Sequence, residues 1–321
     1  MGEFELIRNF FAAAPCAQPG EGVALGIGDD CALLSVAAGE QLAISTDTLV
    51  AGVHFPDVCD PFLLGQRALG VSASDLAAMG AAPLAFTLAL TLPEVSTDWL
   101  QAFARGLNQM AEGCALRLIG GDTTRGPLSI TVTVFGRVPT GQALTRSGAR
   151  PGDLLCVGGP LGDGAGALPL VLNPRSEQTS TTQALLARYW SPQPQLALGQ
   201  ALRGKATSAL DISDGLLADC GHIALASGVR LLVERERVPM SEALQAFFDP
   251  EQALQAALAG GDDYVLAFTL PPAHLAALQA AGWPVRVIGR VVEGQGVALI
   301  DEQGQDVTPQ TRGYQHFRET R

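Results

Sequence analysis

Lysine is almost absent from this chain of 321 residues: Lys205 is the only one, beside 19 arginines. A phosphate-binding lysine of the Walker or kinase type, or a Schiff-base lysine, would therefore have to be Lys205. Its context, LRGKATSAL, lacks the pattern of a phosphate-binding loop. Positive charge is scarce overall, since the formal net charge is −12 and the sequence pI is about 4.7. This balance argues against a nucleic-acid-binding surface, and we expect no nucleic-acid partner.

Cysteine pairs and long hydrophobic runs are missing as well. The six cysteines are scattered without a C-x-x-C, and most lie among small or apolar residues, which predicts reduced, buried thiols. The longest apolar stretch, PLAFTLALTLP, is too short to span a bilayer. The N-terminal MGEFELIRNFF contains acidic residues and has no apolar signal-peptide core. These features predict a cytoplasmic protein with no membrane partner.

What the chain does contain is ample core material, with 47% hydrophobic and 16% charged residues. This composition is typical of a globular protein, and the length predicts one large or two medium domains. In the first half, the periodicity of apolar residues predicts helices and strands in alternation. The predicted helices span 3–12, 61–80 and 96–115, and the predicted strands span 41–50, 83–93, 128–138 and a segment from 114 that ends at Gly-Gly-Asp.

A segment rich in Gly and Pro, residues 139–153, predicts a domain boundary. Beyond it, strands and helices alternate again, which indicates an α/β or α+β fold in two domains, residues 1–140 and 149–321. The segment GGPLGDGAGAL reads as a loop before a helix, and 175–182 reads as a polar surface loop. Later strands are predicted at LLCVGG, ALDIS, GVRLLVE, YVLAFTL, VRVIGRVV and VALID, and a helix at DGLLADCGHIALASG.

Carboxylates recur at strand ends and in glycine-rich turns, among small or apolar neighbours where an unpaired charge is costly. They are Asp29, Asp30, Asp47, Asp75, Asp122, Asp211, Asp214, Asp262 and Asp263. Each has an ordinary structural alternative, because Asp suits turns and helix caps. Asp29 and Asp30 in GIGDDCA suit a turn, and Asp214 could cap a helix beginning at Gly215.

Taken together, hard oxygen ligands without a His or Cys pattern point to Mg²⁺, Mn²⁺ or Ca²⁺. The acids are spread over most of the chain, so an EF-hand, whose ligands lie within one loop, is excluded. Mg²⁺ is usually shared between one or two carboxylates and substrate phosphates. Phosphoryl transfer is therefore the reaction class that the pattern favours, with Arg146 and Arg137 as candidate charge clamps.

Nine segments in order, from residue 2 to residue 317, resemble the thiamine-monophosphate kinase family. They are GEFELI, GIGDDCA, STDTLVAGVHF, SASDLAAMGA, GGDTT, TRSGARPGD, DISDGL, GGDDY and GYQHF. The resemblance implies a two-domain fold similar to aminoimidazole ribonucleotide synthetase. Residues 1–140 would bind ATP and Mg²⁺ and form a homodimer through their β-sheet, and residues 149–321, an α/β domain, would complete the active site. It also implies ATP- and Mg²⁺-dependent conversion of thiamine monophosphate into thiamine diphosphate, the last step of that biosynthesis.

The resemblance also implies site residues, carried over by matching position. Metal contacts would be Asp30, Ser45, Thr46, Asp47, Asp75, Asp122, Asp211 and Asp214. Nucleotide contacts would be Gly121, Asp122, Arg146 and Ser213, and substrate contacts would be His54, Asp262 and Tyr314. This chain departs from the family at two positions. It has Asp262 where the family more often has Glu, which is one methylene longer. It has Arg105 where the family commonly has an aromatic residue that touches the nucleotide, so the nucleotide contact is not transferred to Arg105.

The acceptor in such a reaction is a phosphate monoester, which is largely deprotonated near neutral pH because its second pKa is about 6. We therefore nominate no general base and expect direct in-line transfer, with Mg²⁺ (or Mn²⁺) and Arg146 offsetting the repulsion between anions. An aspartyl-phosphate route is the mechanistic alternative. A purine-synthesis ligase of the same fold and a non-catalytic store of divalent cations remain the functional alternatives.

Overall fold

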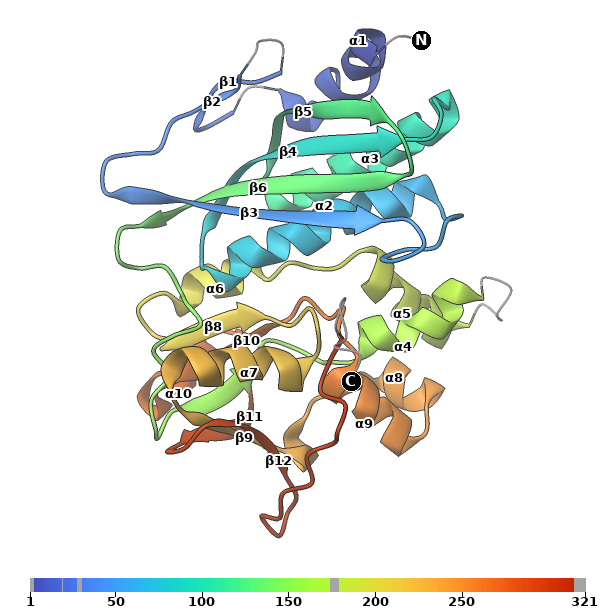
Figure 1. The fold of residues 1–321 in the computed structure, drawn as a ribbon. Coiled ribbons are helices and arrows are strands. Elements are labelled where there is room, and N and C mark those ends of the chain that lie inside the picture. Colours follow the sequence, from blue (N-terminus) through green and yellow to red (C-terminus); the bar gives the residue numbers. More distant parts are fainter. Residues whose placement is uncertain (1–2, 19, 28–30, 174–178, 315–321) are drawn as a thin grey trace, which may run out of the picture. The chain divides into compact units, whose positions relative to one another are not determined.

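The computed structural model describes residues 3–18, 20–27, 31–173 and 179–314 (Figure 1). The chain divides into two compact units. The first comprises Met1–Leu76, Ala81–Ala143 and Trp190–Leu196, and the second comprises Ala77–Gly80, Leu144–Tyr189 and Ala197–Arg321. The main crossing between the units, at residues 143 and 144, therefore lies within the glycine- and proline-rich segment 139–153. Two short segments cross over: Ala77–Gly80 belongs to the second unit although its neighbours in the chain belong to the first, and Trp190–Leu196 belongs to the first although its neighbours belong to the second.

The first unit is built on a four-stranded sheet in the order β3-β6-β4-β5. Its strands are β3 (Glu40–Val50), β4 (Ala82–Leu92), β5 (Arg117–Arg125) and β6 (Ser129–Pro139), and a small hairpin pairs β1 (Val23–Leu25) with β2 (Leu33–Leu34). Its helical elements are α1 (Glu3–Leu6), a π-helical turn (Ile7–Ala12), a 3₁₀ turn (Pro15–Ala17), α2 (Pro61–Ala78) and α3 (Thr97–Cys114). Strands β3 and β6, and β6 and β4, are antiparallel, whereas β4 and β5 are parallel.

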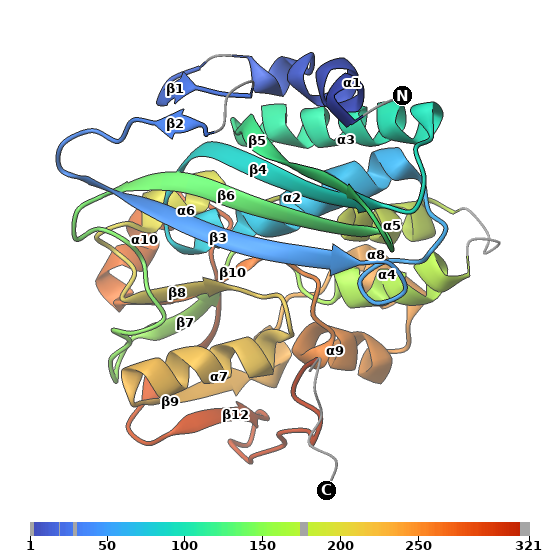
Figure 2. The same ribbon diagram turned by 45° about the horizontal axis from the view of Figure 1, so that its top comes forward.

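Helices α2 and α3 lie on one face of this sheet (Figures 1 and 2). The alternation of side chains along β6 explains why: Ile130, Val132 and Val134 are buried on the helix face, while the residues between them are partly exposed. The two helices approach closely because both carry glycine at the crossing. A Cβ on Gly106 would lie 1.9 Å from the carbonyl oxygen of Phe62, so no larger residue fits there.

Helix α3 confirms its predicted boundaries. The Ser96 side chain accepts a hydrogen bond from the backbone N–H of Trp99, and Ala115 ends the helix in the left-handed conformation at φ 56°. Strand β5 departs from the prediction, because it continues through Gly-Gly-Asp to Arg125 in parallel register with β4. Its end was placed too early because glycine reads as a strand breaker in the sequence, whereas here ladder pairing with β4 carries the strand on.

The second unit is built on a six-stranded sheet in the order β12-β9-β11-β7-β10-β8. Its strands are β7 (Leu154–Val157), β8 (Ser208–Asp211), β9 (Arg230–Glu234), β10 (Leu266–Leu270), β11 (Arg286–Val292) and β12 (Gly296–Ile300). Its helices are α4 (Asp163–Leu172), α5 (Ser180–Trp190), α6 (Leu196–Leu202), α7 (Leu216–Ser227), a 3₁₀ turn (Arg235–Arg237), α8 (Glu242–Phe247), α9 (Pro250–Ala259) and α10 (Pro272–Ala280). All strand pairs are antiparallel except β9 with β12.

The core of the second unit lies between this sheet and α7. Leu217, Cys220 and Ile223 of α7 are fully buried in one cluster with Leu231 and Val233 of β9. The mixed sheets of both units confirm the predicted fold class. Two boundaries in this unit were wrong: α4 begins at Asp163, inside the segment predicted as a loop, and residues 180–182 open α5. Both segments are rich in Gly, Ser or Thr, whose weak helix propensity tertiary packing overrides.

The cysteines bear out most of the expectation made for them. All six are free thiols, and Cys16, Cys114, Cys156 and Cys220 are buried. Burial raises the pKa of the Cys16 and Cys114 thiols to about 11, which keeps them protonated and unreactive. Cys31 is exposed, contrary to the prediction.

Candidate active site

In the first unit, α2 and β3 bring together four polar side chains that the chain separates by about thirty residues. Ser45 and Asp47 are two residues apart on β3, so both project from the face of the sheet that α2 covers. Ser72 and Asp75 are three residues apart on α2 and therefore lie on one side of that helix. The Ser45 hydroxyl donates a hydrogen bond to Asp75 Oδ2, and Ser72 hydrogen-bonds the Asp47 carboxylate.

This cluster carries an unfavourable negative charge. Burial, with a further contribution from the nearby Asp75 carboxylate, raises the pKa of Asp47 to about 6, and the hydrogen bond from Ser72 offsets part of the rise. Two facing carboxylates with a hydroxyl beside them are the donor set that Mg²⁺ or Mn²⁺ uses together with substrate phosphate oxygens. A cation would remove the repulsion, so the residues present fit a divalent metal ion.

Thr46 lies between Ser45 and Asp47 on β3, so its side chain projects from the opposite face of the sheet. Its hydroxyl is 2.9 Å from the Thr133 hydroxyl on β6, and Thr48 and Thr131 make the same contact at 2.8 Å. The structure thus does not bring the Thr46 side chain to the Asp47–Asp75 pair. A role for Thr46 as a metal ligand stays a prediction.

Gly121 and Asp122 lie on β5, an edge strand of the sheet, and both are exposed. Gly121 has φ 150°, and a Cβ there would lie 1.8 Å from the carbonyl oxygen of Leu88. Only glycine allows β5 this approach to β4. Because side chains alternate along the strand, Asp122 projects from the same face as Thr124, opposite to the helices.

His54 lies in the turn that follows β3. Its Nδ1 accepts a hydrogen bond of 3.0 Å from the backbone N–H of Val50. The neutral ring therefore carries its proton on Nε2, where it can donate to an anionic group.

In the second unit, three of the predicted residues lie at the junction of β8 and α7. Asp211 ends β8, and Ser213 and Asp214 lie in the short loop before α7. The sequence suggested Asp214 as a possible cap of this helix, but in the structure Gly215 is the capping residue, and it makes no side-chain hydrogen bond. The carboxylate of Asp219 takes that place from within the helix: its Oδ2 accepts hydrogen bonds from the backbone N–H groups of Ser213, Asp214 and Gly215.

The GGDDY segment is held in an unusual backbone conformation beside this loop. Asp262 and Tyr264 have positive φ angles, 59° and 52°, which are uncommon for residues other than glycine. The backbone N–H of Asp262 donates to the carbonyl of Ser213 at 2.8 Å, and the Tyr264 hydroxyl donates to Asp262 Oδ1 at 2.9 Å. Such strain persists only where surrounding contacts enforce it, and it is typical of binding sites.

Asp263, the neighbour of Asp262, faces the interior. Both of its oxygens lie within 2.9 Å of the backbone N–H of Gly162, which leads into α4. Burial raises the pKa of Asp263 to about 8 against the effect of this hydrogen bond, so the side chain is mainly neutral at pH 7. Asp263 thus anchors the GGDDY segment, while Asp262 is the more accessible acid of the pair.

The backbone of Tyr314 contacts the loop that carries Ser213 and Asp214. Its N–H donates to the carbonyl of Asp214 at 3.0 Å, and the carbonyl of Arg312 accepts from the N–H of Ala218 in α7. The Tyr314 side chain is 50% exposed. The C-terminal segment is therefore fixed against the Asp214 loop while its aromatic ring remains accessible.

The two candidate arginine clamps differ. Arg146 is exposed, and its guanidinium makes no hydrogen bond or ion pair to the residues that the structure describes; its carbonyl accepts from the Ser227 hydroxyl at 3.2 Å. Arg137 instead pairs with Glu21 at 2.7 Å and approaches Glu40 at 3.9 Å. Arg146 is the one of the two with a free cationic group to offer.

Asp30, the remaining predicted metal ligand, lies outside the described residues. Among the described parts of the chain, no group of three or more His, Cys, Asp or Glu side chains is arranged to hold a metal. No described helix is both long and apolar enough to cross a membrane.

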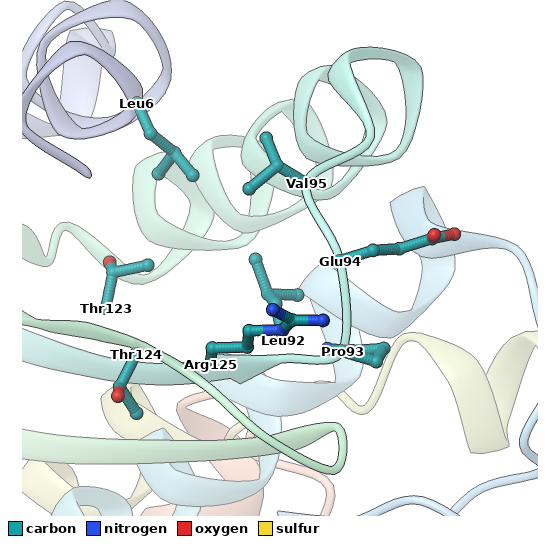
Figure 3. A pocket seen from close by; sticks show the side chains of 8 residues that line it. All are labelled: Leu6, Leu92, Pro93, Glu94, Val95, Thr123, Thr124 and Arg125. Carbon is teal, nitrogen blue, oxygen red and sulfur yellow. The ribbon is translucent and has the colours of Figure 1, made fainter. Parts of the chain in front are cut away.

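A separate cavity of about 480 Å³ lies in the first unit, at the ends of β4 and β5 (Figure 3). It is lined by Leu6, Leu92, Pro93, Glu94, Val95, Thr123, Thr124 and Arg125. Figure 3 shows the Glu94 side chain pointing away from the other lining residues. None of the predicted site residues that the structure describes lines the cavity, although Asp122 directly precedes Thr123 on β5.

Comparison with known proteins places the two units in one class. Residues 28–138 match the AIR synthase related protein N-terminal domain, and residues 150–302 match the corresponding C-terminal domain. The chain is 47% identical to thiamine-monophosphate kinase of Escherichia coli (strain K12) over 98% of both chains. The chain therefore belongs to the AIR synthase related proteins and, within them, to the thiamine-monophosphate kinase family.

Solved structures agree with this assignment. The crystal structure of thiamine-monophosphate kinase from Stenotrophomonas maltophilia K279a is 43% identical, with a TM-score of 0.86 over 96% of this chain and 98% of that chain. AaThiL complexed with AMPPCP and TMP is 31% identical, with a TM-score of 0.81 over 88% of this chain and 89% of that chain. The recognition made from nine short motifs is confirmed.

Proposed function

We propose that this chain transfers the γ-phosphoryl group of ATP to thiamine monophosphate and so forms thiamine diphosphate. The observation that carries the proposal is full-length identity of 47% to a thiamine-monophosphate kinase, together with the likeness to a relative complexed with AMPPCP and TMP. The acidic site agrees with the assignment, because bound Mg²⁺ ions neutralise the charge of the phosphates in phosphoryl transfer, and an acceptor phosphate that is already ionised needs no general base.

The chain's own residues divide the work by their chemistry. Asp47 and Asp75, oriented by Ser45 and Ser72, would hold Mg²⁺ or Mn²⁺, which when bound neutralises charge on the phosphates and fixes their geometry. Arg146 supplies a free guanidinium for a further phosphate oxygen. His54 offers its Nε2–H to the phosphate of the acceptor. The acceptor oxygen is already largely deprotonated near neutral pH, so it needs no general base and can attack the γ-phosphorus directly and in line.

Metal contacts from Asp30, Thr46, Asp122, Asp211 and Asp214, and nucleotide contacts from Gly121 and Ser213, belong to the same proposal. Asp262 and Tyr314 would contact the thiamine moiety. The shared loop contacts of Ser213, Asp214, Asp262 and Tyr314 support this grouping, because the segments that carry these residues are bonded to one another. The cytoplasmic location and the domain limits at 140 and 149 also stay predictions.

A homodimer formed through the sheet of the first unit is a further part of the proposal. Leu42 and Ile44 of β3 are 38% and 59% exposed and, by the alternation of side chains along the strand, project from the face opposite α2 and α3. Exposed apolar side chains on a sheet face favour association with a second apolar face. Light scattering at micromolar concentration should give twice the mass of one chain, and a monomer would refute it.

One assay tests the function against its rivals. ADP formation from ATP should depend on thiamine monophosphate and on Mg²⁺, and thiamine diphosphate should appear in equal amount. A purine-synthesis ligase or a cation store would show no such dependence. Inversion of configuration at an isotopically chiral γ-phosphorus should accompany direct transfer, whereas retention would indicate an aspartyl-phosphate intermediate.

A further inference from the structure

Asp219 has no role in the site as proposed, yet it organises the loop that carries Ser213 and Asp214. It lies one turn inside α7 and is 4% exposed. Its Oδ2 accepts from the backbone N–H groups of Ser213 at 3.1 Å, Asp214 at 3.0 Å and Gly215 at 3.1 Å. Three successive N–H groups that converge on one oxygen fix the path of the backbone at all three residues.

The same loop then holds two other segments through its carbonyl groups. The carbonyl of Ser213 accepts from the N–H of Asp262 at 2.8 Å, and the carbonyl of Asp214 accepts from the N–H of Tyr314 at 3.0 Å. Each peptide group of the loop thus has its N–H side set by Asp219 and its carbonyl side bonded to a segment that carries a proposed substrate contact. A rotation of these peptide groups would move Asp262 and Tyr314 together with Asp214.

We infer that Asp219 is a positioning residue, which sets the loop that carries Ser213 and Asp214 and, through the carbonyls of that loop, the segments that carry Asp262 and Tyr314. The inference rests on the proposed function for the identity of the ligands, but its geometry is independent of that function. Partners that orient metal ligands typically change metal affinity or activity about 10–100-fold when removed. We expect effects of that size on both the metal–nucleotide and the thiamine monophosphate sides.

The experiment compares three variants of the full chain. Asp219→Ala removes the acceptor, and Asp219→Asn keeps one acceptor oxygen of the same reach. Asp249→Ala is the matched control, because Asp249 caps α9 in the same unit through the N–H groups of Glu251 and Gln252. Three readouts are used: amide hydrogen exchange at residues 213–215, binding of Mn²⁺ with AMPPCP measured by electron paramagnetic resonance, and initial rates with ATP and thiamine monophosphate varied.

Asp219→Ala should accelerate exchange at 213–215, weaken Mn²⁺–AMPPCP binding about 10–100-fold, and raise KM for thiamine monophosphate as kcat falls. Asp219→Asn should restore most of each loss, and Asp249→Ala should lower Tm alone. Wild-type binding and kinetics in folded Asp219→Ala would overturn the inference. If Asp219→Ala does not fold, Asp219→Asn decides: faster exchange with weaker Mn²⁺–AMPPCP binding supports the inference, and wild-type values refute it. A wild-type chain inactive on thiamine monophosphate would refute the proposed function alone, because the exchange and Mn²⁺ readouts need no turnover.

Discussion

Replacement of Asp47 by Asn should make the metal-free protein more stable while it removes activity. The Asp47 carboxylate is largely buried beside Asp75, so in the absence of a cation its charge opposes folding. Asn keeps the size of the side chain and an oxygen that can accept from Ser72, but carries no charge. When no metal is bound, the side chain that holds it in our proposal therefore lowers the free energy of unfolding.

The size of the effect follows from the pKa of Asp47, which burial and Asp75 raise from 3.8 to about 6. At about 1.4 kcal/mol per pH unit, the charged form costs about 3 kcal/mol of folding free energy at pH 7. Asn retains part of the burial cost of a polar group, so we expect a gain of about 1–3 kcal/mol. For a domain of this size that corresponds to a rise in Tm of roughly 2–10 °C.

The pH dependence has a defined sign. Because the pKa of this acid is higher in the folded state, folding binds a proton between about pH 4 and pH 6. The penalty is absent below about pH 4, where both states are protonated, and it is complete above pH 6. The stability advantage of Asp47→Asn over the wild type should therefore be full at pH 7 and vanish as the pH falls to 4.

Thermal melting in EDTA measures the stability of the metal-free protein, and melting with Mg²⁺ and AMPPCP measures how much the bound metal and nucleotide stabilise it. Asp47→Asn should melt higher than the wild type in EDTA, gain less from Mg²⁺ and AMPPCP, and lose on the order of 10³-fold in kcat. Glu94→Gln, which neutralises an exposed acid of the same unit, should leave all three values unchanged. A lower Tm in EDTA for Asp47→Asn, or retained turnover, would refute the reasoning.

Three further predictions concern single positions. Gly121→Ala should unfold or severely destabilise the chain in urea titrations, since its Cβ would overlap a backbone oxygen at 1.8 Å, whereas Gly141→Ala, with open space around it, should cost only about 1–2 kcal/mol. Asp263→Asn should match the wild-type Tm near pH 4 and exceed it by a margin that grows up to about pH 8 and is constant above it, because the pKa of Asp263 is raised from 3.8 to about 8 and folding of the wild type must bind a proton over that range; a margin that does not change between pH 4 and pH 8 would contradict this. Tyr314→Ala should raise KM for thiamine monophosphate roughly 3–30-fold and leave KM for ATP unchanged, while Tyr314→Phe keeps the ring and most activity; a lower Tm with unchanged KM would make Tyr314 structural.

Local patterns were sufficient for most elements of this fold. The alternation in SITVTVF predicted β6, and Ser96 predicted the start of α3, because side-chain periodicity and capping depend on neighbours in the chain. The family was likewise recognisable from short motifs in a fixed order. Where prediction failed, as at the end of β5 and the start of α4, a long-range contact outweighed the propensity of Gly-rich segments.

Residue type and order were therefore enough to predict most elements, the family and the list of acids. Which acids face one another was decided only by the tertiary structure. Asp47 meets Asp75 because a strand with a period of two lies against a helix with a period near four, and nothing in either segment names the other. In the sequence, Asp219 is only an acid within an apolar helix. In the structure, its carboxylate accepts hydrogen bonds from the free N–H groups at the N-terminus of that helix. The sequence shows which chemical groups a residue can offer, but its role depends on the contacts, the burial and the neighbouring charges that only the folded structure brings about.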